Sequence, residues 1–292
     1  MLQRELCRHP AIRHVAYSPH TYFETHHWLK AAVLLESDPD RFSGGRVYRG
    51  YGSRRNARTY MEECIRGNVP DFVIPDDDRE LVFEGWEALC QRFARPVFFE
   101  KSPQILAHRV CLDLLQEWME QTSYDMKILG LVRNPLSVMY SAYKLFHTPP
   151  AQRQYGWAEI QRNLLDFRER IPAGQWMLCR YEELISQPKE AFAEICRFAG
   201  VEADDSLGDG VHARSANKWE SDPFFTLQLD ASVKEVARAF GYTESELTNP
   251  EKPTPPLHHR LRRRLEGTLK LTLARLKDRL LVPLRLRMGR RR

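Results

Sequence analysis

The segment that most constrains the fold is residues 127–146, KILGLVRNPLSVMYSAYKLF. Residues 127–132 form an apolar run without alternation, which is typical of a strand buried on both faces of a parallel sheet. Arg133, Asn134 and Pro135 interrupt the run, and a helical pattern follows. A buried strand followed at once by a helix predicts an α/β fold, with a central parallel sheet flanked by helices.

The same alternation of apolar runs and helical patterns extends over most of the chain. It predicts strands at 12–17, 97–100 and 176–180, and helices at 21–36, 55–67, 78–93, 104–121, 188–199 and 230–240. Loops are expected at 41–54 and 145–157, and irregular structure at 203–222. The stiff segment KPTPP at 252–256 then predicts a domain over 1–250 and a separate tail over 251–292.

Arg133 lies at the carboxyl end of a predicted strand, which is where parallel α/β sheets bind ligands. Asn134 can cap the following helix, and Pro135 suits its first turn. Ser137 and Ser141 are four residues apart and therefore share a helical face. A guanidinium, hydroxyls and a helix N-terminus together favour a phosphate monoester. The alternative is that Arg133 pairs with a carboxylate and the serines are solvated.

Three segments resemble sulfotransferases that use 3′-phosphoadenosine 5′-phosphosulfate (PAPS). Arg133 with Ser141 resembles their 3′-phosphate-binding segment. Residues 99–103, FEKSP, resemble the EKS/EKT-P segment of carbohydrate sulfotransferases, and residues 180–184, RYEEL, resemble the family's RYE(D/E)L strand end. The resemblance covers residues 1–225. It implies a P-loop-like fold and sulfuryl transfer from PAPS to a hydroxyl or amine, with a glycan or glycolipid as the expected acceptor.

The resemblance also implies roles for individual residues. Arg133 and Ser141 would hold the 3′-phosphate, Tyr181 would lie near the adenine, and Lys101 would offset charge on the leaving group. Residues 212–219, HARSANKW, occupy the place of a late cofactor-binding loop, and the cofactor contacts expected there are Arg214, Lys218 and Trp219. Two alternatives are that Trp219 is a core aromatic residue and that Lys101 forms an exposed pair with Glu100.

The catalytic base is expected within residues 18–30, SPHTYFETHHWLK, because the family places a Glu or His shortly after this strand. Heparan-type members have a Glu before Pro-His, where this chain has Ser18. The candidates are therefore His20, Glu24, His26 and His27. A helix through 21–30 would put positions 20 and 24 on one face, which favours His20 or Glu24. His26 and His27 are alternatively surface or core histidines.

The family also has a strand, a loop such as KSGTT or RSGTT, and a helix, whose backbone N–H groups hold the 5′-phosphosulfate. This chain has no such loop, and residues 1–10 resemble the helix that follows it. One explanation is that Met1 is an internal methionine. The other is a catalytically inactive adaptor that binds a membrane or a partner. The first is favoured, because deleting a central strand leaves its neighbours without hydrogen-bond partners.

The C-terminal stretch differs sharply in charge from the rest of the chain. Residues 260–292 carry 13 basic and 2 acidic residues, a net charge of +11 in a chain whose total is +5. Leucines at 257, 261, 265, 269, 273, 276 and 280 follow helical spacing. The pattern predicts a basic amphipathic helix suited to an anionic membrane surface. Alternatively, the leucines pack on the domain. Nucleic acid is not expected as a partner, since no aromatic residues are interleaved.

The remaining composition bears on compartment and cofactors. Six scattered cysteines without a CxxC pair indicate reduced thiols and a cytoplasmic protein, peripheral at the inner membrane face if the tail binds lipid. No metal-ligand spacing appears, so no metal is expected. No GxxxxGK[ST] sequence is present, which argues against a P-loop kinase.

Overall fold

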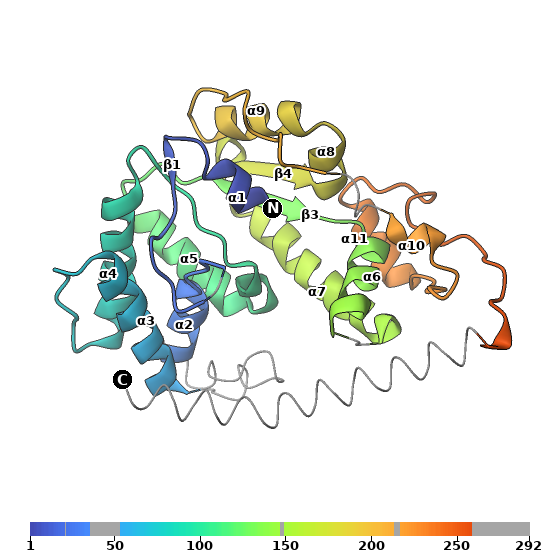
Figure 1. Ribbon diagram of the computed structural model, residues 1–292. Coiled ribbons are helices and arrows are strands. Elements are labelled where there is room, and N and C mark those ends of the chain that lie inside the picture. Colours follow the sequence, from blue (N-terminus) through green and yellow to red (C-terminus); the bar gives the residue numbers. More distant parts are fainter. Residues whose placement is uncertain (21, 36–52, 147–148, 213–216, 259–292) are drawn as a thin grey trace. The chain divides into compact units, whose positions relative to one another are not determined.

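The computed structural model (Figure 1) describes residues 1–20, 22–35, 53–146, 149–212 and 217–258. The chain divides into two compact units. Unit 1 comprises residues 1–132 and 159–214, and unit 2 comprises residues 133–158 and 215–292. Both units are discontinuous in sequence. The predicted boundary at residue 250 stays a prediction.

Unit 1 contains all four described strands and most of the helices. Its helices are α1 (Leu2–Leu6), α2 (His27–Leu35), α3 (Arg54–Asn68), α4 (Asp78–Phe93), α5 (Arg109–Gln121), α8 (Tyr181–Ser186) and α9 (Pro188–Phe198), with 3₁₀ helices at Pro103–Ala107 and Ala173–Gln175. Its strands are β1 (Ile12–Arg13), β2 (Val97–Phe98), β3 (Ile128–Val132) and β4 (Trp176–Arg180). The helix α7 (Pro150–Arg168) contributes to both units.

The strands confirm the predicted parallel pairing but form two pairs. β1 pairs with β2 through Ile12 and Val97, and β3 pairs with β4 over five residues, from Ile128–Trp176 to Val132–Arg180. The mixed α/β character with parallel strands flanked by helices is as predicted. The single central sheet is instead two two-stranded sheets among the described residues.

The core of unit 1 is built around the apolar helix α2, which contacts α3, α4 and α5. Nearly every residue of α2 is buried, as its mainly apolar sequence indicates, and the buried residues include His27 and Lys30. Trp28 of α2 lies against Trp86 of α4 and Trp118 of α5, with ring centroids 5.5 and 6.1 Å away. Large aromatic rings in mutual edge contact give this core much of its buried area. The core therefore fixes the start of α2, where the candidate base residues lie.

Unit 2 contains α6 (Pro135–Phe146), the first part of α7, α10 (Lys218–Ser221) and α11 (Ala231–Arg238). The predicted cap of α6 is confirmed, because Asn134 Oδ1 accepts hydrogen bonds from the amides of Leu136 (2.8 Å) and Ser137 (3.3 Å). Asn134 Nδ2 also donates to the Glu246 carbonyl at 2.8 Å. One buried side chain thus starts α6 and ties it to a distant segment of the same unit.

We expect Asn134→Ala to lower the free energy of unfolding by about 1–3 kcal/mol, since it removes a helix cap and leaves a carbonyl without its donor. Urea denaturation followed by circular dichroism measures this loss. Asn134→Ser is the matched control, because its neutral hydroxyl oxygen can still cap α6 and it lacks the amide donor to Glu246. An equal loss in both variants would show that the cap contributes nothing.

Three sequence expectations are corrected or fall outside the described residues. Residues 150–157, predicted as loop, belong to α7, and the irregular stretch 203–222 includes the short helix α10. The basic stretch 260–292 lies outside the described residues, so its membrane binding stays a prediction.

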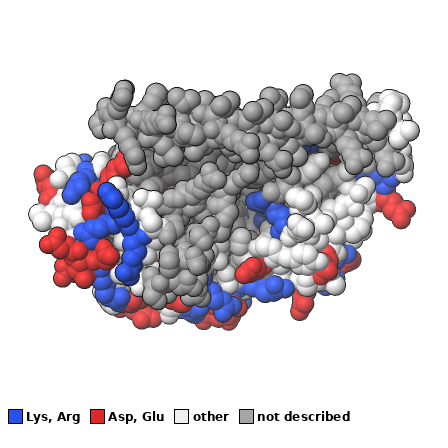
Figure 2. Space-filling model, turned by 90° about the horizontal axis from the view of Figure 1, so that it is seen from below, with Lys and Arg blue, Asp and Glu red and all other residues white. Residues whose placement is uncertain are grey.

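Among the described helices, none has the length and hydropathy to span a bilayer. Figure 2 shows described basic and acidic side chains interspersed on one face.

Candidate active site

The loop between β1 and α2 places the candidate base residues. A helix was predicted from residue 21, but α2 begins at His27. Phe23 and His26 have φ angles of 55° and 50°, in the left-handed region that interrupts a right-handed helix. The Glu24 carbonyl accepts hydrogen bonds from the hydroxyls of Ser18 (2.6 Å) and Tyr60 (3.2 Å). These contacts hold residues 18–20 and 22–26 as a loop folded around Glu24.

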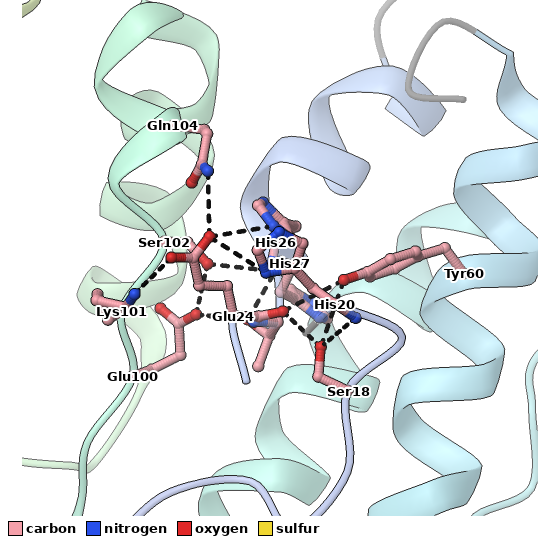
Figure 3. A network of polar contacts seen from close by, with 11 residues as sticks. Ser18, His20, Glu24, His26, His27, Tyr60, Glu100, Lys101, Ser102 and Gln104 are labelled. Carbon is pink, nitrogen blue, oxygen red and sulfur yellow. Dashed lines mark hydrogen bonds and ion pairs between the residues drawn. The ribbon is translucent and has the colours of Figure 1, made fainter. Parts of the chain in front are cut away.

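The Glu24 carboxylate is buried at the centre of a polar network (Figure 3). Its Oε1 lies 2.5 Å from Lys101 Nζ, and its Oε2 accepts a hydrogen bond from Gln104 Nε2 at 3.1 Å. His26 Nε2 and His20 Nδ1 lie 3.3 and 3.5 Å from Oε2. His20, Glu24 and Lys101, all predicted as catalytic, therefore lie together.

The two histidines beside Glu24 differ in exposure. His26 is fully buried, whereas 28% of the His20 side chain is exposed. Burial and the neighbouring His20 lower the pKa of His26 to about 4, so its ring is neutral near pH 7. The rings pack edge to face with centroids 4.6 Å apart. Of the histidines near Glu24, His20 is therefore the one with access to a solvent-borne molecule.

The Glu100 carboxylate supports the site through hydrogen bonds to Ser102 and Thr25. Its Oε1 accepts hydrogen bonds from Ser102 Oγ (2.5 Å) and Thr25 Oγ1 (2.8 Å), and Ser102 Oγ accepts from the His26 amide (3.0 Å). Burial raises the pKa of Glu100, and the hydrogen bonds from Ser102 and Thr25 act in the opposite direction. The alternative pair between Lys101 and Glu100 is not formed, because Lys101 contacts Glu24 instead.

His27, the fourth candidate base, belongs to the core. Its Nε2–H donates to the Val82 carbonyl of α4 at 2.8 Å, and its ring lies 4.8 Å from that of Trp86. Burial lowers the pKa of His27 to about 4, while the bond to Val82 acts in the opposite direction. The alternative that His27 is a core histidine is confirmed, and His27 is not placed to take a proton from a substrate.

We expect His27→Gln to lower the free energy of unfolding by about 1–3 kcal/mol at pH 7.5, because a flexible amide replaces a buried ring that packs on Trp86 and bonds to Val82. The folded-state pKa of His27 lies below the unfolded value of about 6.5. Wild type therefore loses stability as the pH falls from 6.5 toward 4, and the difference from the variant narrows. Urea titrations across this range measure it. The exposed His258, changed to Gln, is the control, and a difference that grows on acidification would contradict the assignment.

The predicted phosphate site lies at the start of α6 in unit 2. Arg133 and Ser141 are both half-buried, and Ser141 lies one turn beyond Ser137 on the same face. Ser137 is buried and its Oγ accepts a hydrogen bond from Trp219 Nε1 at 3.1 Å. Ser137 and the amides capped by Asn134 are thus engaged within the protein. A guanidinium and a hydroxyl at the start of a helix have the chemistry to bind an anion, so the assignment of Arg133 and Ser141 to a phosphate stays a prediction.

The other predicted cofactor contacts differ in their settings. Trp219 is buried, as in the core alternative, and its carbonyl accepts a hydrogen bond from Lys252 Nζ at 2.5 Å. Lys218 begins α10 and is exposed. Tyr181 is half-buried and begins α8 directly after β4. Arg214 lies outside the described residues, and the roles of these residues stay predictions.

Gln104 and Ser102 were not predicted from the sequence. Both follow Lys101 within three residues, and both reach the Glu24 network. The available signal was the FEKSP segment at 99–103, which contains Ser102 and directly precedes Gln104. Lys252 was also missed, since it lies in a proline-rich stretch and gave no sign of the two carbonyls that it binds, Trp219 and Phe225.

Comparison with known proteins identifies the family. The model described as "Sulfotransferase family" matches residues 1–205, and the chain belongs to this family. The sulfotransferase domain of the olefin synthase from Synechococcus PCC 7002 superposes with a TM-score of 0.51 at 20% identity, covering 80% of this chain and 94% of that domain. This likeness confirms the predicted sulfotransferase fold.

Two curated relatives share part of the sequence. Human carbohydrate sulfotransferase 3 is 27% identical over 174 residues, which cover 45% of this chain and 36% of the relative. The mouse protein of the same name is 25% identical over 142 residues, which cover 41% and 30%. The chain thus matches about one third of the length of these relatives.

Proposed function

We propose that the protein transfers a sulfuryl group from PAPS to a hydroxyl of a carbohydrate acceptor, with Glu24 as the general base. The observation that carries the proposal is the Glu24 carboxylate, buried in the loop after β1 and contacted at 2.5 Å by Lys101 Nζ. Membership of the sulfotransferase family supports the reaction class. A fixed carboxylate beside an ammonium can take a proton and steady a developing negative charge.

The proposed step moves one proton and one sulfuryl group. The acceptor hydroxyl loses its proton to Glu24 as its oxygen forms a bond to sulfur, and the bond from sulfur to the donor's phosphate oxygen breaks. The electron pair of that bond leaves with 3′-phosphoadenosine 5′-phosphate. Lys101 would donate a hydrogen bond to the oxygen that gains charge. Transfers of this kind depend mainly on positioning and electrostatics.

Donor recognition is assigned to the start of α6. Arg133 and Ser141 would hold the 3′-phosphate, as the resemblance to PAPS-dependent enzymes implies. The assignment is supported by their half-buried position at the start of α6, where a guanidinium and a hydroxyl can approach a ligand. PAPS, when bound, supplies the activated sulfuryl group. Charge-assisted hydrogen bonds to a phosphate are the strong ones in a protein.

A carbohydrate acceptor is supported by the rings beside Glu24. Tyr22 is 68% exposed, and its ring lies 5.5 Å from that of His20 and 6.0 Å from Lys101 Nζ. An exposed aromatic face next to polar groups suits the apolar face of a sugar ring, whose hydroxyls can then reach the carboxylate. The names of the curated relatives point to the same class of acceptor.

The test is transfer of labelled sulfate from PAPS by the full chain to a panel of glycans and glycolipids, together with calorimetry of 3′-phosphoadenosine 5′-phosphate. We expect label on at least one sugar hydroxyl and saturable nucleotide binding. Absence of nucleotide binding would overturn the donor assignment. Nucleotide binding with transfer only to amines would overturn the acceptor assignment.

A further inference from the structure

Three side chains beside the proposed base have the chemistry and spacing of a metal site. His20, Glu24 and His26 each offer one ligand atom, and these atoms all lie within 4.8 Å of one another. We propose that they bind a divalent transition-metal ion of the Zn²⁺ class, which competes with the role of Glu24 as a base. The proposed metal binding rests on geometry alone, whereas the proposed competition with the base also rests on the proposed function.

The distances suit a tetrahedral ion. Zn²⁺ lies about 2.0–2.1 Å from imidazole nitrogen and carboxylate oxygen, so neighbouring ligand atoms are roughly 3.3–3.4 Å apart at the tetrahedral angle. His26 Nε2 and His20 Nδ1 lie 3.3 and 3.5 Å from Glu24 Oε2. The rings of the two histidines are edge to face, with centroids 4.6 Å apart, so both lie beside Glu24. A modest rotation of the partly exposed His20 ring would complete the three-ligand set.

The ligands are held in place by contacts that leave coordination feasible. Lys101 contacts Oε1 of Glu24, whereas both histidines face Oε2. Gln104 donates to Oε2 and orients the carboxylate, and the His26 amide is fixed by Ser102. Outer contacts of this kind orient metal ligands and strengthen binding. Two imidazoles with one carboxylate favour Zn²⁺, Co²⁺ or Ni²⁺ over Mg²⁺ and Ca²⁺, which prefer oxygen ligands.

The site differs from a structural zinc site in two respects. It offers three protein ligands, which leaves a fourth position of a tetrahedral ion for water or a substrate oxygen. The Lys101 ammonium beside Glu24 opposes a second cation. The ion should therefore bind reversibly, and it should bind more tightly when the ammonium is removed. An ion on Oε2 also occupies the oxygen that would receive the proton.

The experiment titrates the full chain, free of metal, with Co²⁺ and follows the visible d–d absorption, then adds Zn²⁺ as a competitor. We expect one Co²⁺ per chain in a four-coordinate spectrum, displaced by Zn²⁺. His20→Ala should weaken binding at least tenfold, and Lys101→Gln should strengthen it. His258→Ala, at an exposed histidine outside the site, should change nothing. Equal Co²⁺ binding in wild type and His20→Ala would overturn the site.

His26→Ala is the second variant, with circular dichroism as a check on folding because His26 is fully buried. His20→Ala keeps the test decisive if that variant does not fold. Inhibition of sulfate transfer by Zn²⁺, relieved by a chelator, tests the competition separately. Spectroscopic binding without any transfer activity would sustain the site and overturn the proposed function. Transfer that is insensitive to Zn²⁺ at saturating spectroscopic occupancy would overturn the competition.

Discussion

Glu24→Gln is expected to lower kcat for sulfate transfer by roughly 10²- to 10⁴-fold, the usual contribution of a positioned general base. The amide keeps the shape of the carboxylate and its contact with Gln104, but it cannot take the acceptor proton. Binding of 3′-phosphoadenosine 5′-phosphate should stay within about twofold of wild type, because Glu24 is assigned no nucleotide contact. Initial rates at saturating donor and calorimetry measure the two quantities.

The matched control is Glu235→Gln, a neutralised glutamate on the exposed face of α11. It removes the same charge and should leave kcat unchanged. The two variants together separate loss of the base from loss of net charge. If Glu24→Gln kept wild-type kcat while remaining folded, His20 would become the base to test.

Arg133→Met should weaken binding of 3′-phosphoadenosine 5′-phosphate by about 10- to 100-fold, since a hydrogen bond to a charged group contributes roughly 1.5–3 kcal/mol. The loss should be specific to the 3′-phosphate. Adenosine 5′-phosphate, which lacks that group, should bind wild type and variant alike. The measurement is calorimetry of both nucleotides, and the informative quantity is the ratio of the two affinities.

Arg133→Lys keeps the positive charge but loses the bidentate geometry of the guanidinium. It should therefore retain only part of the wild-type preference for the 3′-phosphorylated nucleotide. Arg153→Met, at an exposed arginine on α7 in the same unit, is the control for lost positive charge. A preference for the 3′-phosphorylated nucleotide that survives Arg133→Met would remove residue 133 from the donor site.

Elements with strong local signals were predictable from sequence. The strand β3 and the helix α6 follow from an apolar run, a capping Asn134 and Pro135 in the first turn, and each of these acts within a few residues. The helices α3, α4 and α9 agree with their predicted bounds to within one residue at each end. The family assignment was reachable for the same reason, because its motifs are short and contiguous.

The loop around Glu24 was not predictable in this way. The spacing of residues 20 and 24 predicted neighbours on a helix, and they are neighbours, but through a loop with left-handed residues at 23 and 26. Phe rarely adopts that conformation, and although His adopts it more often than most residues, one histidine is too weak a signal to predict the loop. The loop is fixed instead by Ser18 within the loop itself, and by Tyr60 and the Glu100 network, which are distant in sequence.

Long-range pairing also explains the other errors. Glu100 and Lys101 are adjacent in sequence and were weighed as a pair, yet each bonds to the loop after β1, Glu100 to Thr25 and Lys101 to Glu24. The division into two discontinuous units likewise depends on contacts between distant segments. Periodicity and capping report local preferences, and they say nothing about such partners.

The positive φ angles at Phe23 and His26 carry a consequence for engineering. A non-glycine residue in that region lowers the free energy of unfolding by about 1–3 kcal/mol. The loop conformation that holds Glu24 therefore reduces thermal stability. We expect directed evolution for thermal stability to select Phe23→Gly, which removes the backbone strain at a partly exposed position. The same change would make the loop that holds the Glu24 carboxylate more flexible. We therefore expect Phe23→Gly to raise thermal stability and to lower kcat.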